Sequence, residues 1–371
     1  MSGLAGVPTT VVGDSGRKKR VTILASGDES RETVAVSKQW YRHKERAITV
    51  KEALSRQQLG RGSIHSVGIE SSDTAVGDLR GKRIRVAADP EGDVSALDAV
   101  PSSVEGIPVR TVEAERPRQT DCYNSRRDDV DGDGESEFLG GMAFEGMKNI
   151  KSSQDTVEAG TLCCPVQYNG GRYMLTARHV ISGDVCNRPG LTESDYGWGR
   201  VGNNSDSVTP FGYVAAAFTS YDAALLTLTS SDLQDFSPRV SAESGAEVVG
   251  RVTGDGIDTL ASYPAATVYK RGRNTCATSG VIVSARLTFR DKCGLGTPVD
   301  ELGQVRTSAT QKQRDSGGPV YHRINNSSGT DELYLLNMAT RNYGEYKYAQ
   351  GSSADILHRQ EGFDFGNSKY Y

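Results

Sequence analysis

Long hydrophobic runs are missing from this sequence of 371 residues. No segment approaches the roughly 18 consecutive apolar residues that span a membrane as a helix. A secretory signal is missing as well, because the apolar run at 21–25 ends after five residues at the polar run 26–29. We therefore expect a cytoplasmic protein without a membrane partner.

The short motifs that mark zinc and nucleotide sites are also missing. The sequence contains no Cys-x-x-Cys, no His-Glu-x-x-His and no Gly-x-x-x-x-Gly-Lys-Ser/Thr. The nearest approach to a metal site is Asp129, Asp131 and Asp133, which alternate as in the first half of an EF-hand-type calcium loop. The twelfth position of that loop is Gly140 where a bidentate Glu is needed. A solvated acidic linker is therefore the favoured interpretation, and no cofactor is expected.

A large excess of one charge is missing too. The chain has 43 basic and 47 acidic residues, a net charge of −4, and the two signs are interspersed. This composition gives no sign of a nucleic-acid partner. Six cysteines are too few for a disulfide scaffold in a chain of this length. What remains is a globular protein whose length allows two or three domains.

What the sequence does contain is a serine in a glycine-rich turn. Residues 313–320 read Gln-Arg-Asp-Ser-Gly-Gly-Pro-Val, and the two glycines allow a tight turn that exposes the hydroxyl of Ser316. A serine hydroxyl is a weak nucleophile at neutral pH and needs a base to take its proton. The candidate base is His179, in Leu-Thr-Ala-Arg-His-Val. Asp222 lies 43 residues after it and 94 before Ser316, and is the candidate carboxylate that orients the imidazole.

These three motifs, in the order His, Asp, Ser, resemble those of the trypsin-like (chymotrypsin-fold) serine peptidase family, in particular bacterial and plant-type members with an extra N-terminal module. A fourth stretch, 268–281, resembles the Lys-x-Gly-Arg-Thr-Thr-Gly-x-Thr-x-Gly-Val strand of the bacterial members. The resemblance implies a mainly β fold, with two six-stranded antiparallel β-barrels preceded by a small α+β module. The active site would lie where the two barrels meet.

The same resemblance assigns the oxyanion hole to the backbone N–H groups of Arg314 and Ser316. The family usually has Gly where this chain has Arg314, and a non-Gly residue in a left-handed conformation costs about 1 kcal/mol. Because the donor is a backbone group, we expect it to remain usable. Asp315 matches the acid that pairs with a new N-terminus in many relatives. Since no Ile-Val-Gly-Gly occurs near residue 141, we expect Asp315 to find an internal cation or backbone donors.

Substrate preference is implied by the same resemblance. In this fold the floor of the primary specificity pocket lies about six residues before the nucleophile, at Thr310, and its wall includes Met338 and Ala339. None of these residues is acidic, so the resemblance offers no partner for a substrate Arg or Lys. We expect a preference for an uncharged side chain.

Two disulfides are candidates. Relatives carry a bridge across the histidine loop, which Cys164–Cys186 would match, and Cys163 competes with Cys164 for that role. Cys276 and Cys293 flank a candidate hairpin and form the second candidate pair. In a reducing compartment all six cysteines would be thiols, and the sequence leaves both states open.

The N-terminal third divides into a tail, a module and a linker. Residues 1–42 are polar and lack periodicity, so we predict that they are disordered. Residues 43–115 predict the small α+β module, with a helix at 50–59 capped by Thr49 and Glu52. Strand patterns follow at 63–71, 82–88 and 106–112. The acidic and Gly-rich stretch 116–150 predicts a linker.

Residues 151–371 form the predicted peptidase domain. Short runs rich in Val, Thr, Tyr and Leu, separated by turn residues, are typical of barrel strands. Barrel one would span about 155–235 and barrel two about 245–350, with a C-terminal helix at 352–360. The first barrel would carry the histidine and the aspartate, and the second the serine.

These observations predict a serine endopeptidase that hydrolyses peptide bonds through an acyl-enzyme on Ser316, with a protein or peptide substrate as its partner. Two alternatives stay open. One is a weakly active or inactive protease-fold protein with a binding or regulatory role, and the other is a peptidase that processes itself. Motifs specify residue types and not the geometry of the oxyanion hole, so the sequence does not separate them.

Overall fold

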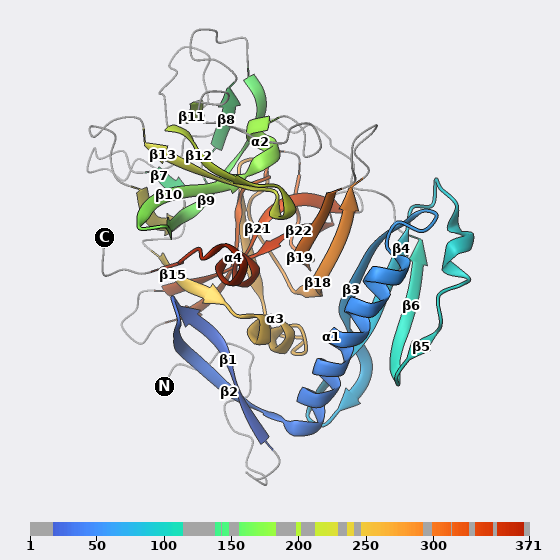
Figure 1. Cartoon of the computed structure of the whole chain (residues 1–371). Helices are drawn as coiled ribbons and strands as arrows, with labels where there is room; N and C mark the ends of the chain where they lie inside the picture. Colours follow the sequence, from blue (N-terminus) through green and yellow to red (C-terminus); the bar gives the residue numbers. More distant parts are fainter. Residues whose placement is uncertain are drawn as a thin grey trace.

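Two β-sheets make up the body of the molecule (Figure 1). The computed structural model describes residues 18–113, 138–141, 143–147, 156–182, 198–201, 212–228, 236–240, 246–291, 299–312, 314–325, 331–343 and 347–366. Within these residues the structure is mainly β, as the resemblance implied. No described helix is both long enough and apolar enough to cross a lipid bilayer.

The first sheet has six antiparallel strands in the order β11-β8-β9-β10-β13-β12. Its strands are β8 (Ala143–Met147), β9 (Thr156–Tyr168), β10 (Gly171–Ala177), β11 (Trp198–Val201), β12 (Gly212–Phe218) and β13 (Ala223–Leu228). At the centre, β10 and β13 pair so that Ala177 lies opposite Ala223. The residues that follow Ala177 and the residue that precedes Ala223 therefore meet at one end of the sheet.

The second sheet has sixteen strands, along the path β17-β16-β20-β21-β22-β19-β18-β3-β4-β6-β5 with five further strands beside it. Those from the C-terminal half are β14 (Phe236–Val240), β15 (Glu247–Val252), β16 (Val268–Gly272), β17 (Cys276–Gly280), β18 (Ile282–Asp291), β19 (Val299–Thr307), β20 (Pro319–Asn325), β21 (Asp331–Tyr343) and β22 (Tyr348–Ser353). Those from the N-terminal half are β1 (Lys18–Ser26), β2 (Glu29–Ser37), β3 (Ile64–Val76), β4 (Leu79–Ala88), β5 (Ser103–Val104), β6 (Ile107–Glu113) and β7 (Phe138–Gly140).

The N-terminal strands extend this second sheet, so it is larger than the six strands that the resemblance implied. Strand β3 pairs with β18, with Glu70 opposite Ser284, and β1 pairs with β15, with Leu24 opposite Val252. The predicted strands at 63–71, 82–88 and 106–112 match β3, β4 and β6. The N-terminal module is thus continuous in hydrogen bonding with the serine-bearing half of the molecule.

The long helix α1 (Lys38–Gln58) begins twelve residues before the predicted helix at 50–59. Its N-cap is Ser37, whose hydroxyl accepts a hydrogen bond from the N–H of Trp40. Thr49 was predicted as the cap but lies inside the helix. The sequence pattern did not predict the first turns because their buried face carries Lys44 as well as Trp40 and Ala47.

Two other N-terminal predictions differ from the structure. Residues 18–37 of the predicted disordered tail form the hairpin β1–β2, whose buried side chains include Val21, Ile23 and Val36. Part of the predicted linker 116–150 is ordered, since β7 and β8 lie within it. Strand β8 belongs to the first sheet, so that sheet begins earlier than the predicted boundary.

The short helices complete the fold. They are η2 (Val94–Leu97), α2 (Arg178–Ser182), η3 (Thr219–Tyr221), α3 (Gly254–Leu260) and α4 (Ala354–Glu361). The predicted C-terminal helix at 352–360 matches α4, which Ser353 caps. One apolar core contains Leu162 and Leu225 from the first sheet together with Tyr321 and Met338 from the second. This shared core joins the two sheets at the level of the candidate site.

Candidate active site

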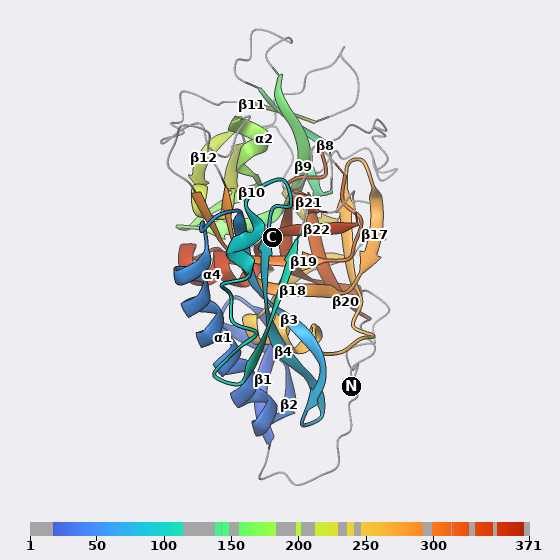
Figure 2. The ribbon, with the colours of Figure 1, turned by 90° about the vertical axis from the view of Figure 1, so that its right-hand side faces the viewer.

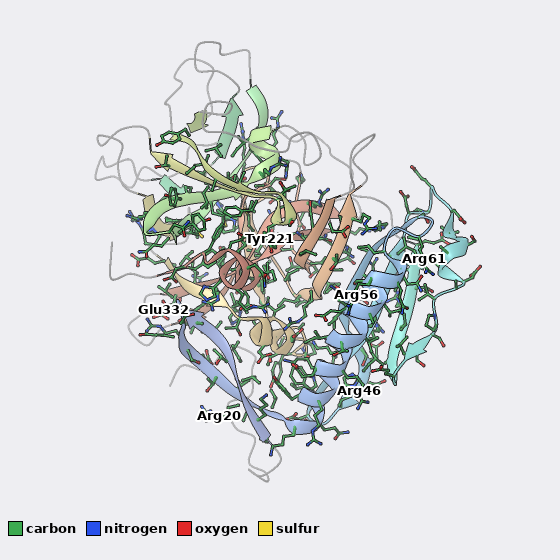
Figure 3. All side chains as sticks on the ribbon, in the orientation of Figure 1. Arg20, Arg46, Arg56, Arg61, Tyr221 and Glu332 are labelled. Carbon is green, nitrogen blue, oxygen red and sulfur yellow. The ribbon has the colours of Figure 1, made fainter. Side chains whose placement is uncertain are left out.

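The first two candidate residues meet at the end of the first sheet. His179 lies in α2, directly after β10, and Asp222 lies between η3 and β13. The Nδ1 of His179 and the Oδ2 of Asp222 are 2.6 Å apart, and the backbone N–H of His179 donates to Oδ1 at 3.0 Å. Asp222 adopts a left-handed conformation, with φ of 49°, which turns its carboxylate toward the histidine. Its neighbour Tyr221 lies between the two sheets in Figure 3, and its carbonyl accepts from Ser352 Oγ at 2.6 Å.

The environment of Asp222 keeps its carboxyl ionised. The side chain is fully buried, and burial alone would raise its pKa. The charge of His179 and the hydrogen bonds that it donates outweigh burial, so the pKa of Asp222 is lowered. An ionised carboxylate only accepts, so Nδ1 of His179 carries a proton and Nε2 has the lone pair in the neutral ring. His179 is thereby prepared to act as a base through Nε2.

The serine lies on a turn that is held from both sheets. Within the turn, the N–H of Gly318 donates to the carbonyl of Asp315 at 2.9 Å. The N–H of Gly317 donates to Ala339 of β21 at 2.6 Å, and the carbonyl of Ser316 accepts from Thr161 of β9 at 2.7 Å. Gly317 has φ of 94°, and a Cβ there would lie 1.9 Å from the carbonyl oxygen of Thr161. The loop therefore needs glycine at 317 to approach the first sheet.

Asp315 has an internal cation, as the sequence predicted. Its buried carboxylate accepts from Lys270 Nζ at 2.9 Å, from the Thr275 hydroxyl at 2.6 Å and from the backbone N–H of Asn274 at 2.7 Å. The N–H of Lys312 adds a further donor at 2.9 Å. Burial would raise the pKa of Asp315, but the charge of Lys270 and these donors lower it. The loop is thus anchored within the chain itself.

The hydroxyl of Ser316 points away from the expected partner. Its Oγ donates to the carbonyl of Thr340 in β21 at 3.0 Å. A hydroxyl has one proton, so in this conformation the proton is not donated to His179. Rotation about the Cα–Cβ bond of Ser316 is the change that would redirect it. The structure therefore brings the three residues to one junction and leaves the serine in a different hydrogen bond.

The predicted oxyanion loop has the expected backbone conformation. Arg314 has φ of 68°, the left-handed geometry for which the family uses Gly. The carbonyl of Arg314 accepts from the Thr161 hydroxyl at 2.9 Å, and that of Asp315 is occupied by Gly318. Among the described residues, the N–H of Ser316 donates no hydrogen bond.

Thr161 is the residue that sequence reasoning missed. Its hydroxyl donates to Arg314, its N–H donates to the carbonyl of Ser316, and its hydroxyl also accepts from the N–H of Arg273. Thr161 thus attaches the serine turn to the first sheet at two points, the carbonyl of Arg314 and the carbonyl of Ser316. No motif surrounds Thr161, so only the three-dimensional contacts reveal this role.

The predicted specificity residues, Thr310, Met338 and Ala339, are all among the described residues. The carbonyl of Thr310 accepts from the Thr278 hydroxyl at 3.0 Å. Met338 and Ala339 are fully buried, and Met338 packs in the core shared by both sheets. A preference for an uncharged side chain remains a prediction.

The candidate disulfides gain no support. Cys163 and Cys164 are buried and Cys276 is exposed, and all three are free. Their predicted partners, Cys186 and Cys293, lie outside the described residues. The acidic run at 129–133 also lies outside them, and the described residues contain no group of three metal-ligating side chains.

Comparison with known proteins finds similarity in structure only. The sequence matches no protein-family model and no curated protein. A glutamic-acid-specific serine protease matches over 61% of this chain and 98% of its own, with 18% identity and a TM-score of 0.41. Thermobifida fusca Protease A matches over 62% and 98%, with 19% identity and a TM-score of 0.41. A Nocardiopsis protease matches over 62% and 99%, with 18% identity and a TM-score of 0.40. These likenesses are too weak to carry a functional argument, which has to come from the geometry of the site.

Proposed function

We propose that this chain is a serine endopeptidase whose nucleophile, base and orienting carboxylate are Ser316, His179 and Asp222. The observation that carries the proposal is the 2.6 Å contact between Nδ1 of the buried histidine and Asp222, at the junction where the serine turn is held. A buried carboxylate that sets the tautomer of a histidine is what a general base at neutral pH requires.

The proposed reaction is acyl transfer in two stages. Ser316 Oγ attacks the carbonyl carbon of the substrate while Nε2 of His179 takes the hydroxyl proton. The N–H groups of Ser316 and Arg314 stabilise the oxyanion, and His179 then gives its proton to the departing amine. Water attacks the resulting ester by the same route in reverse and releases Ser316. The hydroxyl must first leave the Thr340 carbonyl, so substrate binding is expected to accompany its rotation.

A fluorophosphonate probe tests this proposal, because it phosphonylates an activated serine. Purified wild type, Ser316→Ala and His179→Ala are compared by gel fluorescence and by intact mass. We expect one equivalent of label on the wild type and none on either variant. Folded wild type that takes no label would reject the proposal.

A second candidate function is a protease-fold binding protein without turnover. The hydrogen bond from Ser316 to Thr340 favours this candidate, since it withdraws the nucleophile from the base. The two candidates separate in the labelling experiment. Intact mass after incubation also tests self-processing, which would remove N-terminal residues in the wild type and not in Ser316→Ala.

A further inference from the structure

A groove of about 540 Å³ lies on the second sheet, away from the serine turn. It is lined by strands β3, β4 and β6 of the N-terminal part and by β18 and β19 of the serine-bearing part. Helix α1 packs on the other face of the same strands, where Ile84 and Val86 join Val50 and Leu54 in one core. Figure 2 shows α1 along one side of β3 and β4. Since side chains alternate along a strand, the residues between the core positions face the groove.

Five arginines line this groove, against three acidic residues. The arginines are Arg80, Arg83, Arg85, Arg110 and Arg306, and the acids are Glu70, Asp73 and Glu113. Arg85 and Arg110 lie directly opposite each other on β4 and β6. Like charges in directly opposed positions destabilise a sheet. The arrangement would be stabilised by an anion between them.

Among the described residues, the acids of the groove pair with only two of its arginines: Arg83 contacts Glu70 and Asp73, and Arg85 contacts Glu70. Glu70 is shared by Arg83 and Arg85, at 3.5 and 3.3 Å from their Nε atoms. Arg85 is about nine-tenths buried, and its Nη1 has no hydrogen-bond partner among the described residues. A buried charged donor without a partner destabilises the fold, and an anion from outside would relieve that cost. The exposed side chains of Arg80 and Arg110 make no ion pair with any described residue.

Hydrogen bonds across the sheet connect Arg306 of the groove with Thr340, the acceptor of the Ser316 hydroxyl. Arg306 donates to Gln350 Oε1 at 3.1 and 2.8 Å, and the carbonyl of Gln350 accepts from the hydroxyl of Thr340 at 3.5 Å. Thr340 is the acceptor of the Ser316 hydroxyl. From β21 to β4 the path crosses five strand intervals of about 4.8 Å, or about 24 Å, which an extended peptide covers with roughly seven residues.

We propose that this groove binds an acidic stretch of the peptide substrate, about seven residues from the bond that Ser316 attacks. The inference rests on the proposed function only because it calls the bound peptide a substrate. Binding of the peptide to the groove does not require turnover. Carboxylates of an extended peptide would meet the exposed side chains of Arg80 and Arg110, and the Arg85 guanidinium beside them. Bidentate pairing with carboxylates is the geometry that guanidinium groups favour.

Binding is tested first on full-length Ser316→Ala, so that no cleavage intervenes. The probes are a fluorescein-labelled glutamate-rich peptide and a matched glutamine-rich peptide, followed by anisotropy at low and high salt. We expect the glutamate peptide to bind more tightly, and salt to weaken that binding. Adding Arg80→Gln and Arg110→Gln should weaken it by about tenfold, because two exposed charges are lost.

The matched control is Arg42→Gln with Arg46→Gln in the same Ser316→Ala background. Both control residues are exposed on α1, on the opposite face of the strands, and Figure 3 places Arg46 on that helix. The control should leave affinity unchanged, and thermal unfolding should show that every variant is folded. Equal binding of the two peptides, or equal loss in the groove and control variants, would overturn the proposal.

The remaining outcomes separate this inference from the proposed function. If the wild type hydrolyses peptides, an acidic extension of the substrate should lower KM with little change in kcat, and Arg80→Gln/Arg110→Gln should abolish that effect. If the wild type hydrolyses nothing while Ser316→Ala binds the glutamate peptide, the proposed function fails and the arginine-lined groove stands as a binding site for an acidic peptide. Binding that appears only after Asp129, Asp131 and Asp133 are changed to Asn would assign the groove to the chain's own acidic run and overturn the proposal.

Discussion

The carboxylate of Asp222 decides which nitrogen of His179 carries the proton. Its replacement by Asn keeps the shape but offers an N–H₂ donor to the imidazole, which favours the wrong tautomer. We expect Asp222→Asn to reduce kcat by roughly 10⁴-fold, as the same change does in an established triad enzyme. The measurement is peptide hydrolysis, or the rate of fluorophosphonate labelling if no substrate is found. A variant as fast as the wild type would remove Asp222 from the mechanism.

Arg314 is the residue at which the backbone is strained. Its φ of 68° is accessible to Gly at no steric cost, whereas any residue with a Cβ pays about 1 kcal/mol. We expect Arg314→Gly to have a higher free energy of unfolding than Arg314→Ala by about that amount. The comparison with Ala cancels the loss of the arginine side chain. Denaturant titration measures the difference, and an Ala variant at least as stable as the Gly variant would contradict the strain.

At the scale of elements, the ion pair between Lys270 of β16 and Asp315 holds the turn that carries Ser316. Lys270→Met leaves the Asp315 carboxylate buried without its cation. We expect it to lower the free energy of unfolding by about 3–5 kcal/mol, as when a buried pair is broken, and denaturant titration measures this loss.

The lowered pKa of Asp315 makes its contribution to stability depend on pH. That contribution is present above the ordinary pKa of 3.8 and is lost as the pH falls through the folded value. Wild type should therefore lose more stability on acidification than Asp315→Asn. Denaturant titrations between neutral pH and about pH 3 test this, and parallel curves would contradict it.

At the scale of the whole molecule, buried lysines join the N-terminal part to the serine-bearing half. Lys82 of β4 is fully buried, donates to the carbonyl of Asp258 in α3 at 2.7 Å, and has its pKa lowered by burial to about 8. Between about pH 8 and the ordinary value of 10.5, the unfolded chain binds more protons than the folded chain, so stability rises with pH. Relative to Lys82→Met, the wild type should gain up to about 1.4 kcal/mol per pH unit in this window.

Chemical denaturation of both proteins at several pH values checks that gain. Taking the difference between them cancels the other groups that titrate in this range, including Lys51, whose pKa burial also lowers to about 8. A difference that stays constant with pH would show that Lys82 is not held in a desolvated site. A gain would indicate that Lys82 is buried against α3 in the folded protein.

The sequence by itself determined the features that local chemistry encodes. The three motifs, the glycines of the serine turn, the helix capped by Ser353 and strands such as β4 and β6 can be read from neighbouring residues. These elements depend on turns, caps and alternating burial over a few positions. The internal cation for Asp315 was also expected, although the sequence did not identify Lys270 as that cation.

Only the tertiary structure decided how distant segments pair. Three contacts join residues more than twenty positions apart. They are the pairing of β3 with β18, the hydrogen bond from Thr161 to Arg314 and the hydrogen bond from Ser316 to Thr340. The sequence did not predict where α1 begins, because lysines on its buried face form hydrogen bonds with residues of α3 and β18. The arginines of the groove come from three separate strands, and strand register aligns them on one face. Register is set by long-range packing, which no local pattern records.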